Sequence, residues 1–329
     1  MDYIKKILSL KSNNSKAFEA LAIKIFAEQA INNQVYSRYL SLLSIVPSDI
    51  RYITDIPFMP ISFYKNHVVK TGLWNAEKVF KSSGTSSTTQ RSAHFVKSLQ
   101  WYDTISSKIK DQLSIAEKST IVALLPSYLE KGDSSLVHMV KQFSKSNPEG
   151  REYFYLHDFQ KLNDTILEML NEGNRVTFFA VTFALLDFAK QFQIHNENLE
   201  VIFTGGMKNK KKEMFFEDIH KQLKLSFAHS KIISEYGMTE LLSQSYSDEM
   251  GDYIAGFSKK VIPFEINDPL VQAPFNKTAQ LGIVDLANFD TCSFILTEDL
   301  GQVKPDGKFK VIGRLSQSDL RGCNLLYLE

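Results

Sequence analysis

Short apolar runs rich in β-branched residues alternate with amphipathic stretches between residues 119 and 236, and this alternation constrains the fold more than any other feature. The apolar runs predict strands at 120–125, 175–179, 199–203 and 231–234. The stretches between and after them predict helices at 134–143, 183–192 and 213–223, and a short helix at Glu240. The first of these helices has Ser134 or Ser135 as its expected N-cap. Such alternation is typical of a mainly parallel sheet covered on both faces, with ligands at the carboxyl ends of the strands.

The flanking regions differ from this central pattern. The first 46 residues predict helices, because Phe18, Leu21 and Phe26 are spaced for one helical face and the segment ends at Pro47. Beyond about residue 250 helical periodicity fades, and short strand-like runs are expected at 282–286, 293–297 and 309–312. These runs predict a small β-rich subdomain packed on the parallel sheet.

Composition excludes several classes of function. With a net charge of +1, the protein has no overall electrostatic potential that would attract it to nucleic acid or to a membrane surface. The longest apolar run, 176–189, contains Asp187 and is shorter than the ~18 residues of a membrane span. The chain has 2 cysteines and no CxxC pair, which favours a reducing compartment, and its first residues lack a signal-peptide core. We therefore expect a cytoplasmic protein without nucleic-acid partners.

A segment dense in hydroxyl groups and glycine lies at residues 81–91. It contains Ser82, Ser83, Gly84, Thr85 and Ser86. Backbone N–H groups and short hydroxyls in such a loop can surround anionic oxygens, because glycine permits close approach. The GxxxxGK[ST] spacing of the Walker A loop is absent. The segment predicts a phosphate-binding loop of another kind, although taken alone it is more typical of a flexible polar loop.

Further polar segments follow the predicted strands. Gly205 and Gly206 come directly after the strand at 199–203 and allow backbone contact with a flat ligand. In the segment 236–240, an aromatic ring can stack on a base, a hydroxyl can donate to a phosphate and a carboxylate can bind a hard divalent cation. Later in the chain, Asp299 can accept ribose hydroxyls and Arg314 can hold ribose or phosphate with its fork of donors.

Together, the order and spacing of these segments resemble the acyl-adenylate-forming superfamily, which includes acyl-CoA synthetases and firefly luciferase. The resemblance covers about residues 55 to 323. Its most specific part is Tyr236-Gly237-Met238-Thr239-Glu240. The segment at 82–90 resembles the phosphate-binding motif, Gly205-Gly206 the adenine-side turn, Asp299 the ribose-binding aspartate and Gly313-Arg314 the hinge motif.

Within that superfamily the chain is most similar to the acyl-protein synthetases, the fatty-acid-activating ligases of the luminescence fatty acid reductase complex. The segment at 56–65, the short chain and the Arg-Gly-Cys at 321–323 carry this resemblance. It implies that Cys323 receives the acyl group as a thioester. The remaining cysteine, Cys292, lies in a strand-like run and is expected in the core.

The resemblance implies an α/β adenylate-forming domain at 1–312, with a helical part at 1–50, a β-rich part at about 250–312 and a hinge-like tail at 313–329. It implies a cytoplasmic ligase and acyltransferase that uses ATP and Mg²⁺ to activate a fatty or other carboxylic acid. The acyl-accepting partner would be an acyl-CoA reductase or an acyl carrier. The implied catalytic residues are Cys323, Thr239 and Glu240, the last of which also binds the Mg²⁺. The implied ATP-binding residues are Ser82, Ser83, Gly84, Thr85, Ser86, Gly205, Gly206, Tyr236, Gly237, Asp299 and Arg314.

The sequence also departs from the superfamily pattern. The usual Gly-x-Pro-Lys of the phosphate loop is replaced by residues 87–90, and Arg91 is the expected substitute for its lysine. The mobile C-terminal domain that carries a lysine for adenylation is absent from this sequence. Two alternatives therefore stay open: an acyl-CoA ligase of the phenylacetate-CoA ligase type, and a catalytically inactive relative that binds nucleotide or a partner. Among the histidines, His94 lies close after the hydroxyl-rich segment and is the one to test.

Overall fold

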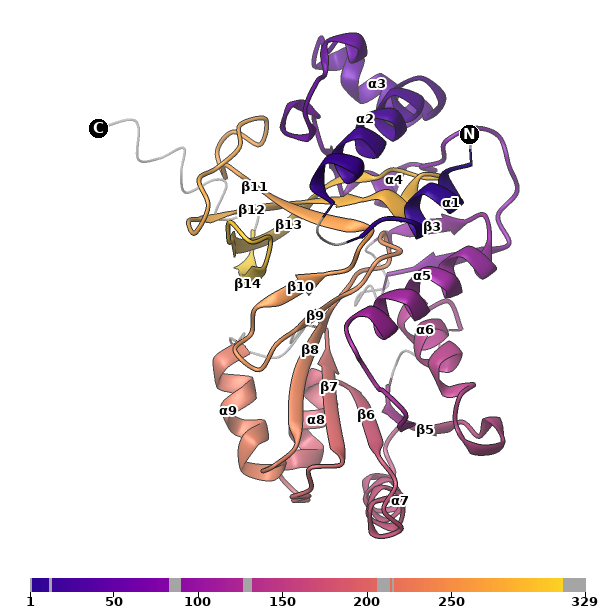
Figure 1. Cartoon of the computed structure of the whole chain (residues 1–329), viewed down its shortest axis with the longest axis vertical. Coiled ribbons are helices and arrows are strands. Elements are labelled where there is room, and N and C mark those ends of the chain that lie inside the picture. The colour runs from indigo at the N-terminus through magenta and orange to yellow at the C-terminus, as the bar shows by residue number, and fades with distance from the viewer. Residues whose placement is uncertain are drawn as a thin grey trace.

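A large mixed sheet organises the chain (Figure 1). The computed structural model describes residues 2–11, 14–82, 90–126, 132–205, 214 and 216–315. Among these residues the sheet has 12 strands, in the order β11-β12-β13-β14-β10-β9-β8-β7-β6-β4-β5, with β1 paired to β13. The remaining strands, β2 (Lys78–Lys81) and β3 (Ala93–Val96), form an antiparallel hairpin.

The parallel part of the sheet agrees with the predicted alternation. Its strands are β4 (Thr120–Leu124), β5 (Tyr153–Tyr155), β6 (Val176–Val181), β7 (Leu199–Thr204) and β8 (Lys231–Tyr236). Every residue of β4 and β6 is buried, as expected for strands covered on both faces. The predicted α/β fold with a parallel-rich sheet flanked by helices is confirmed.

Helices cover both faces of the parallel strands (Figure 1). One face carries α5 (Leu99–Gln112) and α6 (Ser135–Ser144), and the other carries α8 (Thr182–Ala189) and α9 (Phe216–Ser226). A further helix, α7 (Phe159–Asn171), packs on β6. The side chain of Ser134 accepts from the Val137 N–H at 3.3 Å, which confirms Ser134 as the N-cap of α6.

The second part of the sheet is antiparallel and continues from the first. It contains β9 (Ser245–Ser247), β10 (Tyr253–Ala255), β11 (Lys259–Phe264), β12 (Thr278–Asp285), β13 (Phe294–Val303) and β14 (Phe309–Arg314). The short strand β1 (Met59–Pro60) runs parallel to β13. The join lies at β8 and β9, where Tyr236 is opposite Ser245. The strand-like runs predicted after residue 250 all overlap β12, β13 or β14. The division of the chain into domains stays a prediction.

The amino-terminal helices pack on the antiparallel strands. These helices are α1 (Tyr3–Leu8), α2 (Ser15–Asn32) and α3 (Gln34–Leu42), and the short α4 (Phe63–Asn66) follows them. The ring of Phe26 on α2 meets that of Phe294 on β13 at 5.9 Å, edge to face. The buried Gln29 accepts from the Ser293 N–H at 3.0 Å. Single turns of 3-10 helix occur at Pro47–Asp49, Ile53–Asp55, Pro148–Gly150 and Leu286–Asn288.

The short helix predicted at Glu240 is wrong. Thr239 and Glu240 form a turn that follows β8. The Thr239 carbonyl bonds to the His94 side chain and the Glu240 carbonyl to the Asn288 side chain, so other segments occupy the acceptors that a helix would use. In the part of the chain that is described, we find no helix with the length and apolarity that crossing a membrane requires.

Candidate functional site

The candidate site lies at the carboxyl ends of the parallel strands. β7 ends at Thr204, and the hydroxyl of Thr182 donates to the Thr204 carbonyl at 3.1 Å and to the Gly205 carbonyl at 2.6 Å. Gly205 has a φ of +75°, in the left-handed region where glycine is favoured. The predicted turn therefore begins at the expected strand end, while Gly206 lies outside the described residues.

Predicted site residues from distant parts of the sequence come together at the end of β8. The Tyr236 hydroxyl donates to Asp299 Oδ2 at 2.7 Å, and Arg314 Nε lies 3.9 Å from Asp299 Oδ1. Register explains the second contact, because Asp299 on β13 is directly opposite Arg314 on β14. The guanidinium of Arg314 also donates to Glu298 at 2.9 Å, and Lys65 lies 3.8 Å from the same carboxylate. The result is a partly exposed cluster of alternating charges beside a tyrosine hydroxyl.

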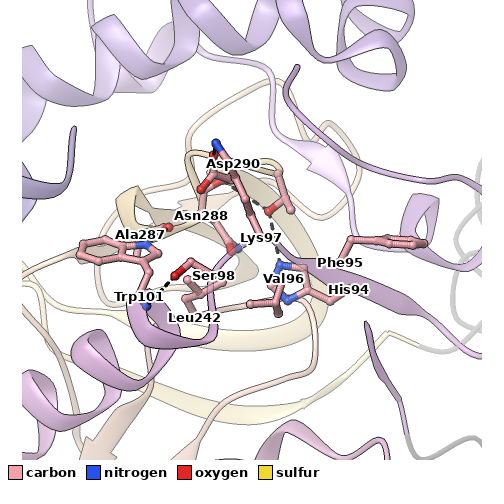
Figure 2. Close-up of a pocket in the computed structure, with 11 residues that line it drawn as sticks. His94, Phe95, Val96, Lys97, Ser98, Trp101, Leu242, Ala287, Asn288 and Asp290 are labelled. Atoms are coloured by element: carbon pink, nitrogen blue, oxygen red, sulfur yellow. Dashed lines mark hydrogen bonds and ion pairs between the residues drawn. The ribbon is translucent and has the colours of Figure 1, made fainter. Parts of the chain in front are cut away.

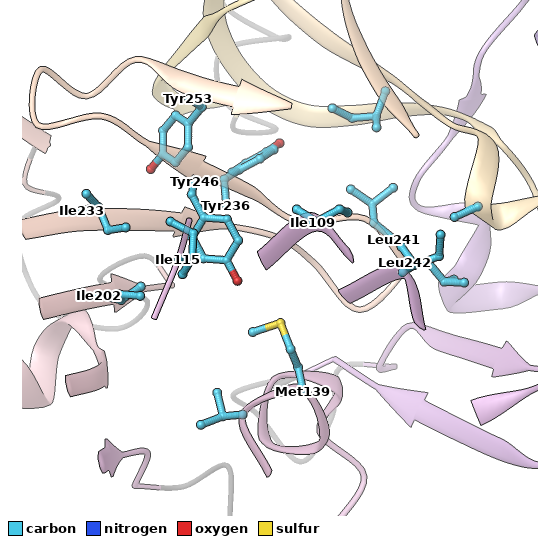
Figure 3. Close-up of a cluster of buried hydrophobic side chains, with 14 of the residues drawn as sticks. Ile109, Ile115, Met139, Ile202, Ile233, Tyr236, Leu241, Leu242, Tyr246 and Tyr253 are labelled. Carbon is cyan, nitrogen blue, oxygen red and sulfur yellow. The ribbon is translucent and has the colours of Figure 1, made fainter. Parts of the chain in front are cut away.

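The Tyr236 ring is largely packed in the interior, with 9% exposure (Figure 3). Its neighbours are Tyr253 at 5.7 Å and Phe309 at 5.5 Å, and the Lys259 ammonium lies 5.6 Å from the ring centroid. Burial and then the nearby Asp299 charge raise the pKa of Tyr236 well above its ordinary value, so the hydroxyl stays a donor. Only a small part of the ring remains for the stacking of a base.

Glu235 and Gly237 flank this tyrosine. The Glu235 carboxylate accepts from the Thr204 hydroxyl and is 6% exposed. Burial raises the pKa of Glu235 to about 6, although the Thr204 hydrogen bond and the Lys259 charge oppose this shift. A Cβ on Gly237 would lie 2.4 Å from Glu235 Oε1. The absence of a Cβ at Gly237 thus permits the close packing of the turn on the carboxylate.

Thr239 and Glu240 are held by side chains from elsewhere in the chain. The Thr239 carbonyl accepts from His94 Nδ1 at 2.8 Å, and the Glu240 carbonyl accepts from Asn288 Nδ2 at 2.7 Å. Glu240 is 5% exposed, and its charge contributes to the raised pKa of Tyr64. No group of three or more potential metal-ligating His, Cys, Asp or Glu side chains occurs in the described ranges.

The segment after Glu240 is anchored by a buried acid and a buried lysine. Asp285 accepts from the Leu242 and Ser243 N–H groups, each at 2.9 Å, and from the Ser243 hydroxyl at 2.6 Å. Lys259 donates to the Ser243 carbonyl at 2.8 Å. Burial lowers the pKa of Lys259 to about 8, against the opposing charges of Asp285 and Glu235. The chain that follows the Thr239–Glu240 turn is thus fixed at Leu242 and Ser243.

The hydroxyl-rich segment is described only at its margins. Ser82 follows β2, and its hydroxyl accepts from the Ser92 N–H at 3.0 Å. Residues 83–89, including the predicted Ser83, Gly84, Thr85 and Ser86, lie outside the described residues. Arg91 binds both oxygens of Asp133, at 2.9 and 3.0 Å, and also the Ser82 and Lys81 carbonyls. Its donors thus brace the base of the segment, which leaves little support for Arg91 as a substitute phosphate-loop lysine.

Of the two cysteines, the structure describes only Cys292. Cys323 lies outside the described residues, so its role stays a prediction. Cys292 is fully buried, as expected, and burial raises the pKa of its thiol to about 12. An inert core thiol is the result.

Sequence reasoning missed several residues of this site, above all Lys259, Asp285 and Asn288. A usable signal existed for one of them: strand alternation places Lys259 on the same face as Val261, toward the interior. The contacts of Asp285 and Asn288 depend on segments more than forty residues away, and no local pattern predicts them.

The chain shares its fold with solved structures that are named as coenzyme A ligases or synthetases. A structure of 2-hydroxyisobutyryl-CoA ligase in complex with 2-HIB-AMP matches with a TM-score of 0.65 and 11% identity, over 93% of this chain and 69% of that chain. An ATP-bound RpMatB–BxBclM chimera matches with a TM-score of 0.52 and 14% identity, over 72% and 47% of the respective chains.

A third similar structure is the O-succinylbenzoate coenzyme A synthetase of Bacillus subtilis in complex with AMP. It has a TM-score of 0.50 and 14% identity, over 73% of this chain and 49% of that chain. Our chain thus spans about half the length of the chimera and of this synthetase. No protein-family model and no curated protein sequence matches the chain.

Proposed function

We propose that the chain uses ATP and Mg²⁺ to activate a carboxylic acid, with a fatty acid as the first candidate, as an acyl-adenylate. The observation that carries this proposal is the Tyr236–Asp299–Arg314 cluster at the strand ends of an adenylate-forming fold. A substrate carboxylate oxygen would attack the α-phosphorus of ATP, and the bond to the bridging oxygen would break to release pyrophosphate. Positioning and charge neutralisation supply most of the catalysis in such a reaction.

The geometry suggests a role for the cluster in ribose binding. Asp299 keeps 17% side-chain exposure while it accepts from Tyr236. A carboxylate has about four acceptor positions, so Asp299 can accept ribose hydroxyls in addition to Tyr236. Arg314, at 43% side-chain exposure, is accessible for a ribose or phosphate oxygen. The Gly205 turn, at the end of the adjacent strand, would lie on the adenine side.

The proposed Mg²⁺ would be held by Glu240 and by the phosphates of ATP. Mg²⁺ commonly uses one or two carboxylates together with substrate phosphates rather than a cage of protein ligands. Thr239, the neighbouring residue, would contact the α-phosphate or the substrate carboxylate. The hydroxyl-rich segment at 82–90, Ser82 to Ser86 above all, would hold the β- and γ-phosphates.

In the second half-reaction, the Cys323 thiolate would attack the acyl carbon, and the bond to the phosphate oxygen would break to release AMP. The thioester would then pass to a protein partner such as an acyl-CoA reductase or an acyl carrier. The alternative acceptor is coenzyme A, which is favoured by the similarity to structures named as CoA ligases. Transfer to Cys323 would leave an acyl thioester on the protein, whereas transfer to coenzyme A would not.

Pyrophosphate exchange into ATP, measured with a panel of carboxylic acids, tests the first half-reaction. We expect acid-dependent exchange in the wild type and its loss in Asp299→Ala. As a matched control, Asp268→Ala removes an exposed carboxylate from the loop between β11 and β12 and should leave exchange unchanged. Wild-type protein that binds ATP but shows no exchange with any acid would support the inactive nucleotide-binding alternative.

Intact-mass analysis after incubation with ATP and an active acid tests the acceptor. We expect an added acyl mass in the wild type, stable to denaturation and absent in Cys323→Ala, with Cys292→Ala as the matched control that retains it. Equal labelling of wild type and Cys323→Ala would contradict the assignment of Cys323. Unlabelled wild-type protein that forms acyl-CoA would establish the alternative acceptor.

A further inference from the structure

His94 connects the β2–β3 hairpin to the turn that carries Thr239 and Glu240, through a hydrogen bond between its side chain and the Thr239 carbonyl. It lies on β3, a few residues after the hydroxyl-rich segment, and is opposite Phe80 on β2. Its ring is fully buried, and the edge-to-face ring of Tyr64 lies 6.0 Å away. His94 and Thr239 are 145 positions apart in the sequence, so this bond is a tertiary link between two predicted parts of the site.

The hydrogen bond fixes the protonation of the imidazole. A carbonyl oxygen only accepts, so Nδ1, at 2.8 Å from the Thr239 carbonyl, must carry the proton. Nε2 then faces the Thr291 hydroxyl at 3.4 Å as an acceptor. Burial lowers the pKa of His94 to about 4, against the opposing effect of the Thr239 bond, which keeps the ring neutral at physiological pH.

A second side chain holds the next carbonyl. Asn288, at the end of the 3-10 turn between β12 and β13, donates to the Glu240 carbonyl at 2.7 Å and is 1% exposed. Figure 2 shows His94 and Asn288 converging from different elements on the same small hollow. Two successive peptide groups are therefore held from two directions, which limits the rotation of the turn and hence the directions of its side chains.

We propose that His94 is a positioning residue for adenylation: its Nδ1–H, together with Asn288, fixes the Thr239–Glu240 turn relative to the hairpin. This inference rests on the proposed function, in which the side chains of Thr239 and Glu240 contact the nucleotide: Thr239 the α-phosphate and Glu240 the Mg²⁺. His94 itself touches neither substrate nor metal in this account. Its effect is on the alignment of the reacting groups and should appear in kcat rather than in the KM for ATP.

A pair of variants separates the donor from the bulk of the ring. In His94→Asn the amide nitrogen is as many bonds from Cα as Nδ1 is, so the donor to Thr239 is kept. In His94→Gln the amide nitrogen is one bond farther from Cα, as Nε2 is, so the donor to the Thr239 carbonyl is lost. We expect His94→Gln to lower kcat for pyrophosphate exchange about tenfold or more, with the KM for ATP changed less than about threefold. His94→Asn should keep kcat within about threefold of the wild type.

A remote variant controls for destabilisation alone. Asn147 is 4% exposed and bonds to the Ile121 N–H and carbonyl near the start of β4, at the opposite end of the strands. Asn147→Ala should lower the melting temperature at least as much as His94→Gln does, with kcat unchanged. Equal kcat in His94→Gln and the wild type, or equal losses in His94→Gln and His94→Asn, would overturn the proposal.

Hydrogen exchange keeps the test independent of activity. Amide exchange at 241–243 should be faster in His94→Gln than in His94→Asn, because the turn before these residues has lost an anchor. If the wild type shows no pyrophosphate exchange, the proposed function fails, while this comparison still tests the anchor. Equal amide exchange in the two variants would then overturn the anchoring role.

Discussion

The ionisation of Glu235 gives a measurable pH dependence of stability. Its carboxylate is 6% exposed, accepts from Thr204 and lies beneath Gly237, and burial raises its pKa from the ordinary 4.5 to about 6. A raised carboxyl pKa means that the folded state disfavours the charged form. The penalty is therefore absent below pH 4.5, develops between pH 4.5 and 6, and is fully present above pH 6.

The size of this penalty follows from the shift. At 1.36 kcal/mol per pKa unit, the interval from 4.5 to about 6 corresponds to about 2 kcal/mol of unfolding free energy. Glu235→Gln keeps an oxygen acceptor for Thr204 but has no charge to bury. We therefore expect the free energy of unfolding of Glu235→Gln, minus that of the wild type, to rise by about 2 kcal/mol between pH 4 and pH 7.

The wild type alone would not show this effect, because His94 acts in the opposite direction. Its folded-state pKa of about 4 lies below the ordinary 6.5, so its contribution to stability falls as pH decreases from 6.5 to 4. Subtraction of the two urea-unfolding series, each measured from pH 4 to pH 7, cancels the His94 contribution. The upper limit of pH 7 also avoids Lys259, whose pKa is about 8.

A second variant makes the test specific. The Thr204 hydrogen bond lowers the pKa of Glu235, so Thr204→Val should move the Glu235 transition to higher pH. A difference between Glu235→Gln and the wild type that is constant from pH 4 to pH 7 would refute the reasoning. So would a difference that falls as pH rises, because that sign requires a lowered pKa.

Three further predictions concern the same region and the core. Gly237→Ala should lower the free energy of unfolding by about 1–3 kcal/mol in urea titrations, because its Cβ would lie 2.4 Å from Glu235 Oε1; an unchanged midpoint would show that the carboxylate moves aside freely. Tyr236→Phe should raise the KM for ATP about tenfold in pyrophosphate exchange, through loss of the 2.7 Å bond that orients Asp299; an unchanged KM would exclude this role. In a Cys323→Ser protein, Cys292 should resist a thiol reagent at pH 8 until denaturant is added, since it is fully buried with a pKa of about 12; rapid labelling of the folded protein would contradict that burial.

The parallel part of the fold was predictable because each strand carries its own signal. The β-branched run from Thr120 and the apolar run from Val176 are long enough to stand out, and the observed β4 and β6 match them closely. The antiparallel part was predictable only in outline. The two-residue β1 is defined by its partner β13, more than two hundred residues later, and no local pattern marks such a pairing.

The candidate site was predictable where a strand end or a strand register brings residues together. Tyr236 follows from the end of β8, and the approach of Asp299 to Arg314 follows from neighbouring strands. The contacts that set the conformation of the turn were not predictable. The segment at Glu240 favours a helix by its own pattern, and the distant His94 and Asn288 hold it in another conformation.

The position of β14 has a consequence for how the molecule assembles. Although β14 comes last among the described strands along the chain, it lies inside the sheet, between β13 and β10. During synthesis, β11, β12 and β13 therefore emerge before the strand that links them to the parallel part. Until residues 309–314 have left the ribosome, the free edges of β10 and β13 are available to wrong partners. We expect Asp299 to align with Tyr236 only after β14 has been inserted, so the proposed nucleotide site would form after residues 309–314 have been synthesised.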